Sequence, residues 1–171
     1  AAMSASRFDP VRLAVLRDLL ESVTEEVAIT CRRTAVSPNI KERRDLSAAL
    51  FDAAGRLLAH AAHIPVHLGA MPRSVEAVRA TLKLAPGEAA IVNDPYAGGS
   101  HLPDLTLVRG VFEPGRTRPC GYLAVRAHHA DVGGAVPGSM APQDDVHAEG
   151  VRIPPLVAVR GDELDPVFAT L

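Results

Sequence analysis

The sheet of this chain is predicted to start in the stretch Leu46-Ser47-Ala48-Ala49-Leu50-Phe51-Asp52-Ala53-Ala54-Gly55-Arg56-Leu57-Leu58-Ala59. Two runs with strand character, 46–51 and 56–59, flank the turn-forming residues Asp52-Ala53-Ala54-Gly55. Glycine takes a positive φ at little steric cost, which a tight turn between strands often requires. The stretch therefore predicts a β-hairpin.

Helices are predicted on both sides of this hairpin. Asp9 suits a helix N-cap and Pro10 suits the first helical position, and apolar residues then recur at steps of three and four. This pattern predicts a long helix over residues 10–33. Pro72 is the expected first residue of a second helix over 72–84, which ends before a proline-glycine pair.

The second half of the chain is richer in glycine and proline than the first. Its apolar segments 89–92, 105–112 and 122–127 are predicted to be strands, and the glycine-rich segments 93–104 and 130–142 to be loops. The predicted fold class is α+β, a mainly antiparallel sheet with a long N-terminal helix and a second helix packed on it.

The length of 171 residues predicts a single domain over 1–171. Its helix-hairpin-helix part spans about 10–84, and a part of loops and strands spans about 85–171. Hydrophobic residues make up 47% and charged residues 22%, which excludes a disordered chain. The net charge of −2 gives no overall positive field, so neither nucleic acid nor a membrane surface is an expected partner.

The longest stretch without Asp, Glu, Lys or Arg, residues 57–72, holds three histidines and two prolines, so no membrane span is expected. The two cysteines are too few for a disulfide framework and favour a reducing, cytoplasmic setting.

One candidate site lies at the end of the first glycine-rich loop. His101 and Asp104 are three residues apart just before a predicted strand, so their side chains are able to point at one centre. Gly98 and Gly99 allow the backbone to approach a ligand closely. A loop histidine that hydrogen-bonds to a nearby aspartate is the simpler alternative.

A second candidate follows the predicted strand 122–127, in His128-His129-Ala130-Asp131. In an extended backbone His128 and His129 point to opposite faces, so one is available to ligate while the other packs or orients a neighbour. Two surface histidines at a strand end remain the alternative. Imidazole and carboxylate together suit a divalent metal such as Zn, Mn or Fe.

Two further groups are weaker candidates. Asp45 closes the charged run 41–45 and is placed to bring a carboxylate inward at a strand start, although such runs are usually solvated. His60, His63 and His67 fall within eight residues and are able to line a pocket, although a single histidine here is more often structural. The chain has no P-loop and no Gly-x-Gly-x-x-Gly motif, so no standard motif for ATP or a dinucleotide is present.

These motifs resemble the hydantoinase B/oxoprolinase family. This family includes the B-type subunits of ATP-dependent hydantoinases and lactamases, part of the 5-oxoprolinases, and the alpha-type subunits of acetone and acetophenone carboxylases. Family subunits are several times longer, so the chain resembles their N-terminal portion. The matching segments are 33–37, 40–47, 51–52, 55–56, 64–71, 93–104, 127–134, 137–140 and 149–155.

The resemblance implies a division of labour between chains. An A-type partner binds ATP and phosphorylates a small cyclic amide or ketone substrate, and the B-type chain carries a divalent metal that completes hydrolysis or carboxylation. The resemblance assigns the metal to His101, Asp104 and His128, and Asp45 is a fourth candidate ligand. It implies catalytic roles for His129 and Asp131 in orienting the ligands. The predicted substrate-binding residues are His67, Gly98 and Gly99.

The expected function is therefore that of the metal-bearing subunit of an ATP-dependent cyclic-amide hydrolase. The alternatives are a subunit of an acetone-type carboxylase, a non-catalytic assembly module that docks through helix 10–33, and an unrelated two-histidine, one-carboxylate oxygenase. The expected partners are an A-type ATP-binding subunit and the remaining C-terminal part of the B-type subunit. Without them the chain is expected to be inactive, with its loop 130–155 left uncovered.

Overall fold

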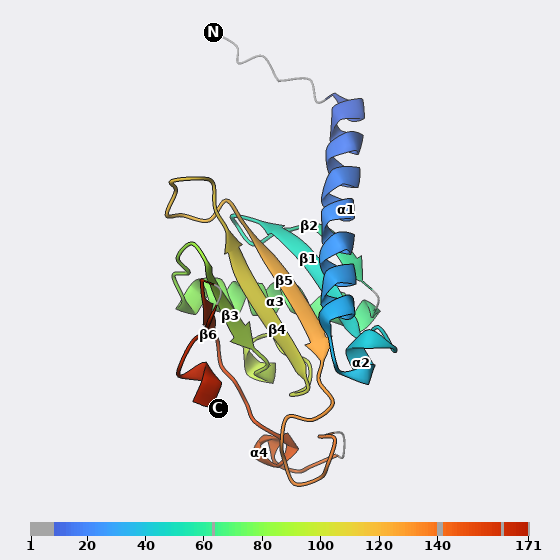
Figure 1. Cartoon of the computed structure of the whole chain (residues 1–171), viewed down its shortest axis with the longest axis vertical. Coiled ribbons are helices and arrows are strands. Elements are labelled where there is room, and N and C mark those ends of the chain that lie inside the picture. The colour runs from blue at the N-terminus through green and yellow to red at the C-terminus, as the bar shows by residue number, and fades with distance from the viewer. Residues whose placement is uncertain (1–8, 63, 140–141, 162, 171) are drawn as a thin grey trace.

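The computed structural model describes residues 9–62, 64–139, 142–161 and 163–170. They form a seven-stranded sheet in the order β2-β1-β5-β4-β3-β6-β7, in which each neighbouring pair of strands is antiparallel (Figure 1). The two longest helices lie against this sheet, so the predicted α+β class with a mainly antiparallel sheet is confirmed. The strands are β1 (Leu46–Asp52), β2 (Leu57–Ala62), β3 (Glu88–Val92), β4 (Asp104–Val111), β5 (Gly121–His128), β6 (Leu156–Arg160) and β7 (Glu163–Leu164).

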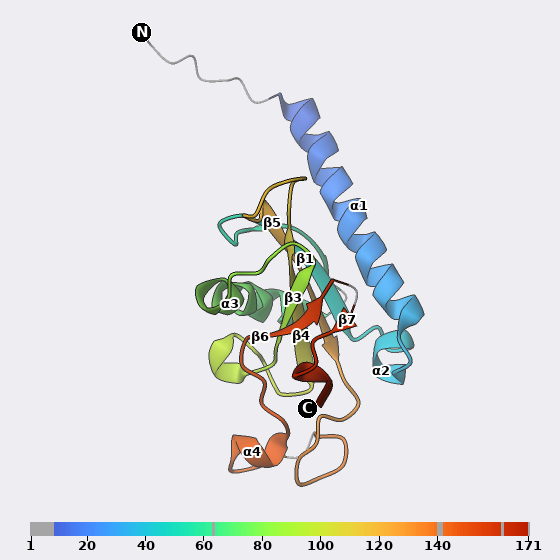
Figure 2. The same ribbon diagram turned by 60° about the vertical axis from the view of Figure 1, so that its left-hand side comes forward.

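Helix α1 (Pro10–Thr34) starts where its capping residues predict. The carboxylate of Asp9 accepts a hydrogen bond from the backbone N–H of Val11 at 3.0 Å. The second half of the helix packs on β1 and β2 and buries Thr24 and Ala28. The first half extends beyond the sheet (Figures 1 and 2). In the described part of the chain, no helix has the length and apolar content that crossing a bilayer requires.

The predicted hairpin is present as β1 and β2. The carboxylate of Asp52 closes its turn by accepting the backbone N–H groups of Ala54 and Arg56, each at 2.9 Å. Gly55 has a φ of 81°, the conformation for which a glycine was expected there. The hairpin extends to residue 62, three residues beyond the predicted end.

Strand β1 is covered on both faces, because alternate residues of a strand point to opposite sides of the sheet. Ala49 and Phe51 pack in the core beneath helix α3 (Pro65–Thr81), whereas Leu46 and Ala48 pack against α1. A smaller cluster around Ile91, Ile153 and Ala158 lies near β3 and β6. The sheet thus has an α3 face and an α1 face, and on β1 the odd-numbered residues belong to the α3 face.

The predicted start of the second helix is wrong. Helix α3 begins at Pro65 and contains Pro72 in its interior, rather than starting there. Pro65 suits the first helical position equally well, because the N–H that proline lacks has no helical partner there. The energetic cost arises about two turns later, because Pro72 provides no N–H for the carbonyl of Leu68. The earlier start places His67 on a packed helix and not in a loop.

The other predicted strands match β3, β4 and β5 to within one residue at each end, and all three begin one residue earlier than predicted. Sequence patterns missed β6 and β7, which add to the β3 edge of the sheet. They also missed two short helices, α2 (Pro38–Lys41) and α4 (Val146–Glu149), and the 3-10 turns η1 (Pro95–Ala97) and η2 (Phe168–Thr170).

Candidate metal centre

Three adjacent strands bring polar residues to one end of the sheet. Asp104, the first residue of β4, pairs directly with His128, the last residue of β5. The backbone N–H of His128 donates to the carbonyl of Asp45, just before β1, at 3.0 Å. On β4 and β5, Asp104 and His128 alternate in step with Val108 and Ala124, which pack in the core beneath α3. Asp45 is in step with Ala49 before β1, so all three polar residues belong to the α3 face. Strand register, rather than closeness in sequence, therefore gathers them.

The carboxylate of Asp104 is the hub of this cluster. It is fully buried, and its Oδ2 and Oδ1 atoms lie 3.3 Å from Nδ1 of His101 and Nδ1 of His128, respectively. Nε2 of His101 lies 3.0 Å from Nδ1 of His128. One donor atom from each of the three residues falls within 4.8 Å of the others. The structure therefore brings together three of the four residues assigned to a metal.

His67 completes the interior side of the cluster. It lies in the first turn of α3 and is 1% exposed. Its Nε2 atom faces two carboxylates, 3.4 Å from Oδ2 of Asp104 and 3.6 Å from Oδ1 of Asp45. Its other ring nitrogen, Nδ1, lies 3.1 Å from the hydroxyl of Ser47. His67 thus connects Asp45 to the cluster from within the protein, and its role in binding substrate stays a prediction.

A buried polar network holds the loop that delivers His101. The carbonyl of Gly98 accepts hydrogen bonds from the hydroxyl of Ser74 at 2.8 Å and from the guanidinium of Arg126 at 3.0 Å. Arg126 also donates from Nε to the hydroxyl of Thr106 at 2.7 Å. These contacts tie the loop to α3 and to two strands. The backbone three residues before His101 is therefore held in place, although the side chain of His101 is 42% exposed.

Gly98 is required by this packing. Its φ is 89°, and a Cβ atom there would overlap the backbone of Arg73 and Ser74 on α3. A Cβ atom on Gly99 would overlap the carbonyl of Asn93. The two glycines thus allow the loop to approach the protein's own backbone, and their prediction as substrate-binding residues stays a prediction.

Burial and hydrogen bonding set the charge of the hub. Burial alone raises the pKa of Asp104, but hydrogen bonds from His67 and Ser100 and the charge of His101 hold the pKa well below its usual range. The hydroxyl of Ser100 donates to Oδ2 of Asp104 at 2.5 Å. Burial lowers the pKa of His101, and the neighbouring His128 lowers it further against the opposing charge of Asp104. An ionised carboxylate beside a neutral imidazole is the protonation state in which both ligate a metal.

The two residues predicted to be catalytic lie outside the cluster. His129 follows the end of β5 and is exposed, and burial of part of its ring and the neighbouring His128 lower its pKa. The carboxylate of Asp131 accepts the backbone N–H groups of Gly133 and Gly138 at 2.8 and 2.9 Å. Asp131 thus organises the loop after β5, and a catalytic role for either residue stays a prediction.

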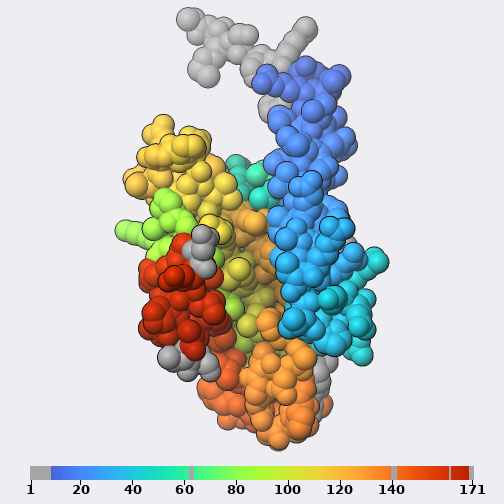
Figure 3. Space-filling model, in the orientation of Figure 1, coloured from blue at the N-terminus to red at the C-terminus, as the bar shows by residue number. Residues whose placement is uncertain are grey.

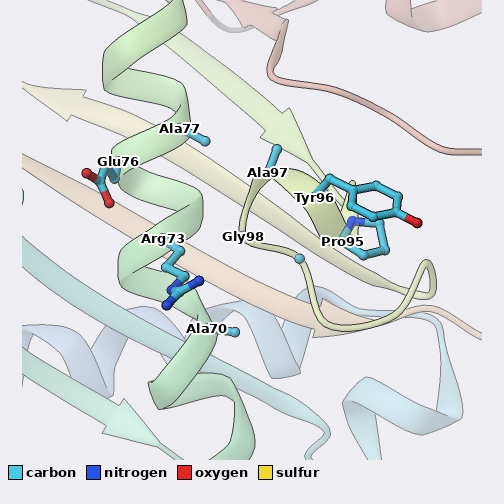
Figure 4. A pocket seen from close by; sticks show the side chains of 9 residues that line it. Ala70, Arg73, Glu76, Ala77, Pro95, Tyr96, Ala97 and Gly98 are labelled. Carbon is cyan, nitrogen blue, oxygen red and sulfur yellow. The ribbon is translucent and has the colours of Figure 1, made fainter.

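A cavity of about 440 Å³ lies beside the loop that carries His101. It is bounded by α3 and by the η1 turn, with Arg73, Glu76 and Tyr96 at its rim (Figure 4). Gly98 and Gly99 line it, but the metal-ligand candidates do not. The cavity is therefore next to the cluster and separate from it.

Ser47, Ser100 and Arg126 also contact this site, although no sequence motif singles them out. Arg126 is two residues before His128 on β5, so strand alternation places it on the same face. That signal was available, but a charged residue in a strand is usually exposed. The contacts of Ser47 and Ser100 depend on the position of α3 and on the loop conformation, which no local pattern reveals.

The donor set fits a divalent ion of the Zn, Mn or Fe type. Two imidazoles and an ionised carboxylate are a common ligand set for such ions, and a third imidazole and a second carboxylate stand beside them. The fold and the site thus define an α+β domain with a candidate His-Asp-His metal centre at one end of an antiparallel sheet.

The model of the hydantoinase B/oxoprolinase family matches residues 9–170, and the chain belongs to this family. It is 41% identical over 167 residues to the 5-oxoprolinase PfmaA of Pestalotiopsis fici, a match that covers 95% of this chain and 13% of that protein.

Two solved structures share the fold. The crystal structure of the ATP-dependent caprolactamase from Pseudomonas jessenii matches with a TM-score of 0.85 and 30% identity, over 96% of this chain and 29% of that one. The nucleotide-free structure of an acetone carboxylase matches with a TM-score of 0.86 and 23% identity, over 95% and 22%. The chain thus spans less than a third of the length of each of these three proteins.

Proposed function

We propose that this chain supplies the metal-binding part of an ATP-dependent cyclic-amide hydrolase of the hydantoinase and 5-oxoprolinase type. The convergence of His101, Asp104 and His128 on one point carries the proposal. The similarity to a 5-oxoprolinase and to an ATP-dependent caprolactamase supports the choice of cyclic amides as the substrate class.

In this proposal His101, Asp104 and His128 hold a divalent ion, with Asp45 or His67 as a further ligand. When bound, such an ion polarises a carbonyl group or lowers the pKa of a water molecule. Asp104 contributes negative charge because hydrogen bonds from its neighbours keep it ionised. Ser47 fixes the ring of His67 through Nδ1, so that Nε2 faces the carboxylates.

His101 and His128 differ in their access to solvent. The side chain of His101 is 42% exposed, whereas that of His128 is 10% exposed. A substrate carbonyl therefore approaches from the His101 side, and His128 and Asp104 form the floor. His129 and Asp131, which follow His128, are proposed to position groups at the rim of this opening.

The chain contains no standard nucleotide-binding motif, so we assign ATP binding to an A-type partner. That partner would transfer the terminal phosphoryl group of ATP to the amide oxygen of the substrate. At the site in this chain, water would then add to the amide carbon, the ring C–N bond would break to leave an acyl phosphate, and a second water would release phosphate and the ring-opened acid. The remainder of a longer B-type subunit is the second expected partner, because the similar proteins are several times longer.

Reconstitution tests this proposal. The chain is combined with an A-type subunit and the complementary B-type segment, and ATP-dependent opening of 5-oxoproline or caprolactam is measured. We expect activity with the wild-type chain and a loss of at least about 100-fold with Asp104→Asn, which removes the central charge. The matched control, Asp144→Asn, changes an exposed carboxylate in the loop before α4 and is expected to retain activity.

The same preparation distinguishes the rival functions. Bicarbonate-dependent consumption of a ketone without ring opening would identify a carboxylase-type subunit instead. Full activity of Asp104→Asn would exclude the proposed metal centre, and robust ring opening by the isolated chain would exclude the division of labour.

A further inference from the structure

The exposed side of α1 carries a row of five regularly spaced residues. Its residues follow steps of four, three, four and three, the spacing of a two-helix coiled coil. Leu16, Leu19 and Val23 form the middle and are 49%, 57% and 40% exposed. Exposed charged residues close both ends. We call Arg12, Leu16, Leu19, Val23 and Glu26 the α1 seam.

The seam faces away from the sheet. At 3.6 residues per turn, it lies roughly 140° around the helix from Thr24 and Ala28, the residues that α1 buries. The first half of α1 also projects past the sheet, where it forms a separate column in the space-filling view (Figure 3). A second helix is therefore able to lie along the seam without contacting the sheet.

The charges at the ends of the seam are complementary to each other. Arg12 and Glu26 lie seven residues before and after Leu19, with opposite charges. In an antiparallel pair of α1 helices centred on Leu19, Arg12 of each copy meets Glu26 of the other. Leu19 meets its own counterpart, and Leu16 lies one residue out of register with Val23 of the other copy, an offset of about 1.5 Å along the helix. Such self-matching is the requirement of a two-fold symmetric interface.

A parallel pair does not have this property, because it places Arg12 beside Arg12 and Glu26 beside Glu26. We propose that the α1 seam is a homodimer interface, in which a second copy of this chain docks antiparallel through the same residues. The seam spans about 21 Å, so the interface is small and a concentration-dependent equilibrium between monomer and dimer is expected.

Charge reversal tests the pairing in the full chain. Sedimentation equilibrium at low salt is run over a series of concentrations for the wild type, Arg12→Glu, Glu26→Arg and the double variant. Each single reversal places like charges at both ends of the seam and is expected to weaken dimerisation about tenfold. The double variant restores opposite charges and is expected to recover the affinity to within about threefold. Arg118→Glu, in the exposed loop between β4 and β5, is the control and is expected to leave association unchanged.

Cysteine cross-linking checks the orientation. In a background with Cys31 and Cys120 replaced by serine, a mixture of Arg12→Cys and Glu26→Cys chains is expected to form a disulfide-linked dimer faster than either variant alone. A wild-type chain that stays monomeric at all concentrations, a double variant as weak as the single ones, or faster cross-linking of either variant alone would overturn the proposal. None of these measurements depends on metal or activity, so their failure is distinct from a failure of the proposed function.

Discussion

Nε2 of His101 and Nδ1 of His128 lie 3.0 Å apart, although the two residues are separated by 27 positions in sequence. The contact depends on two independent features: the register of β4 and β5, which sets His128 beside Asp104, and the loop that returns His101 to Asp104. Two imidazole rings at this distance repel each other strongly when both are protonated, even beside a carboxylate. The pair is therefore organised for a shared cation or for neutral rings.

The first prediction is that His101→Ala abolishes high-affinity metal binding without unfolding the chain. We expect the affinity for Zn²⁺ to fall at least about 100-fold, because one of three converging donors is lost. The unfolding free energy of the metal-free protein is expected to change by less than about 1 kcal/mol, since the side chain is 42% exposed.

Calorimetric titration and chemical denaturation measure the two quantities. His60→Ala is the matched control, because His60 is an exposed histidine on β2 outside the cluster. Unchanged metal affinity in His101→Ala would refute the assignment of this residue as a ligand.

The second prediction concerns Gly98. In Gly98→Ala the new Cβ atom meets the backbone of Arg73 and Ser74, and the φ of 89° is unfavourable for alanine. We expect a loss of about 2–4 kcal/mol in unfolding free energy. We also expect weaker metal binding, because the same loop holds His101.

Gly69→Ala is the comparison for this prediction. Gly69 lies inside α3 with no atom within 4 Å of the position of a Cβ, so alanine is expected to stabilise the helix by about 0.5–1 kcal/mol. Thermal denaturation of both variants gives the test. Equal stability of the two variants would contradict the proposed packing of the loop on α3.

The sequence predicts the parts of this fold that are encoded locally. The Asp9-Pro10 start of α1 and the Asp52–Gly55 turn each carry their own hydrogen-bonding and backbone signals, and both are present. Pro72 misled the prediction because proline is tolerated inside α3, where tertiary packing buries Met71, Ser74 and Val75. The rule that a proline marks the start of a helix takes no account of that packing.

The candidate site also combines residues that local sequence patterns indicate with residues that only tertiary packing brings there. The spacing of His101 and Asp104 indicates a shared centre, and the structure places both with His128. The role of His67 was not predictable from local patterns, because it depends on where α3 begins and on how that helix lies across the sheet. Arg126 was also missed, since its burial follows from the loop that covers it and not from its own strand.

The third prediction concerns Arg126, whose guanidinium is fully buried, with no hydrogen-bond partner for NH1 among the described residues. Burial lowers the pKa of Arg126, against the opposing charge of Asp104, and removing a guanidinium from water carries a free-energy cost. Ser74 continues to donate to Gly98 when the guanidinium is absent. We therefore expect Arg126→Met to lie within about 1 kcal/mol of the wild type in unfolding free energy.

Comparison with Arg126→Ala distinguishes the effect of losing side-chain volume from the effect of losing the charge, because only Arg126→Ala removes most of the volume. It leaves a cavity between α3 and the sheet, and we expect it to lower the unfolding free energy by about 3 kcal/mol. Urea denaturation of the two variants is the measurement. If Arg126→Met proves as unstable as Arg126→Ala, the hydrogen bonds of the guanidinium stabilise the fold more than its desolvation destabilises it, and the prediction fails.

The last prediction concerns stability in acid. A hydrogen bond from the backbone N–H of Arg56 lowers the pKa of Asp52 below its ordinary value of 3.8. Burial opposes this shift, and the Arg56 side chain and the Ala54 N–H lower the pKa further. The unfolded chain therefore takes up this proton at a higher pH than the folded chain. The stabilisation is fully present above about pH 5 and is lost as the pH falls through the folded-state pKa, below 3.8. We expect Asp52→Asn to be less stable than the wild type at pH 6 and the difference to shrink towards pH 2, as measured by urea denaturation across this range. A difference that stays constant with pH would show that the charge of Asp52 does not stabilise the turn.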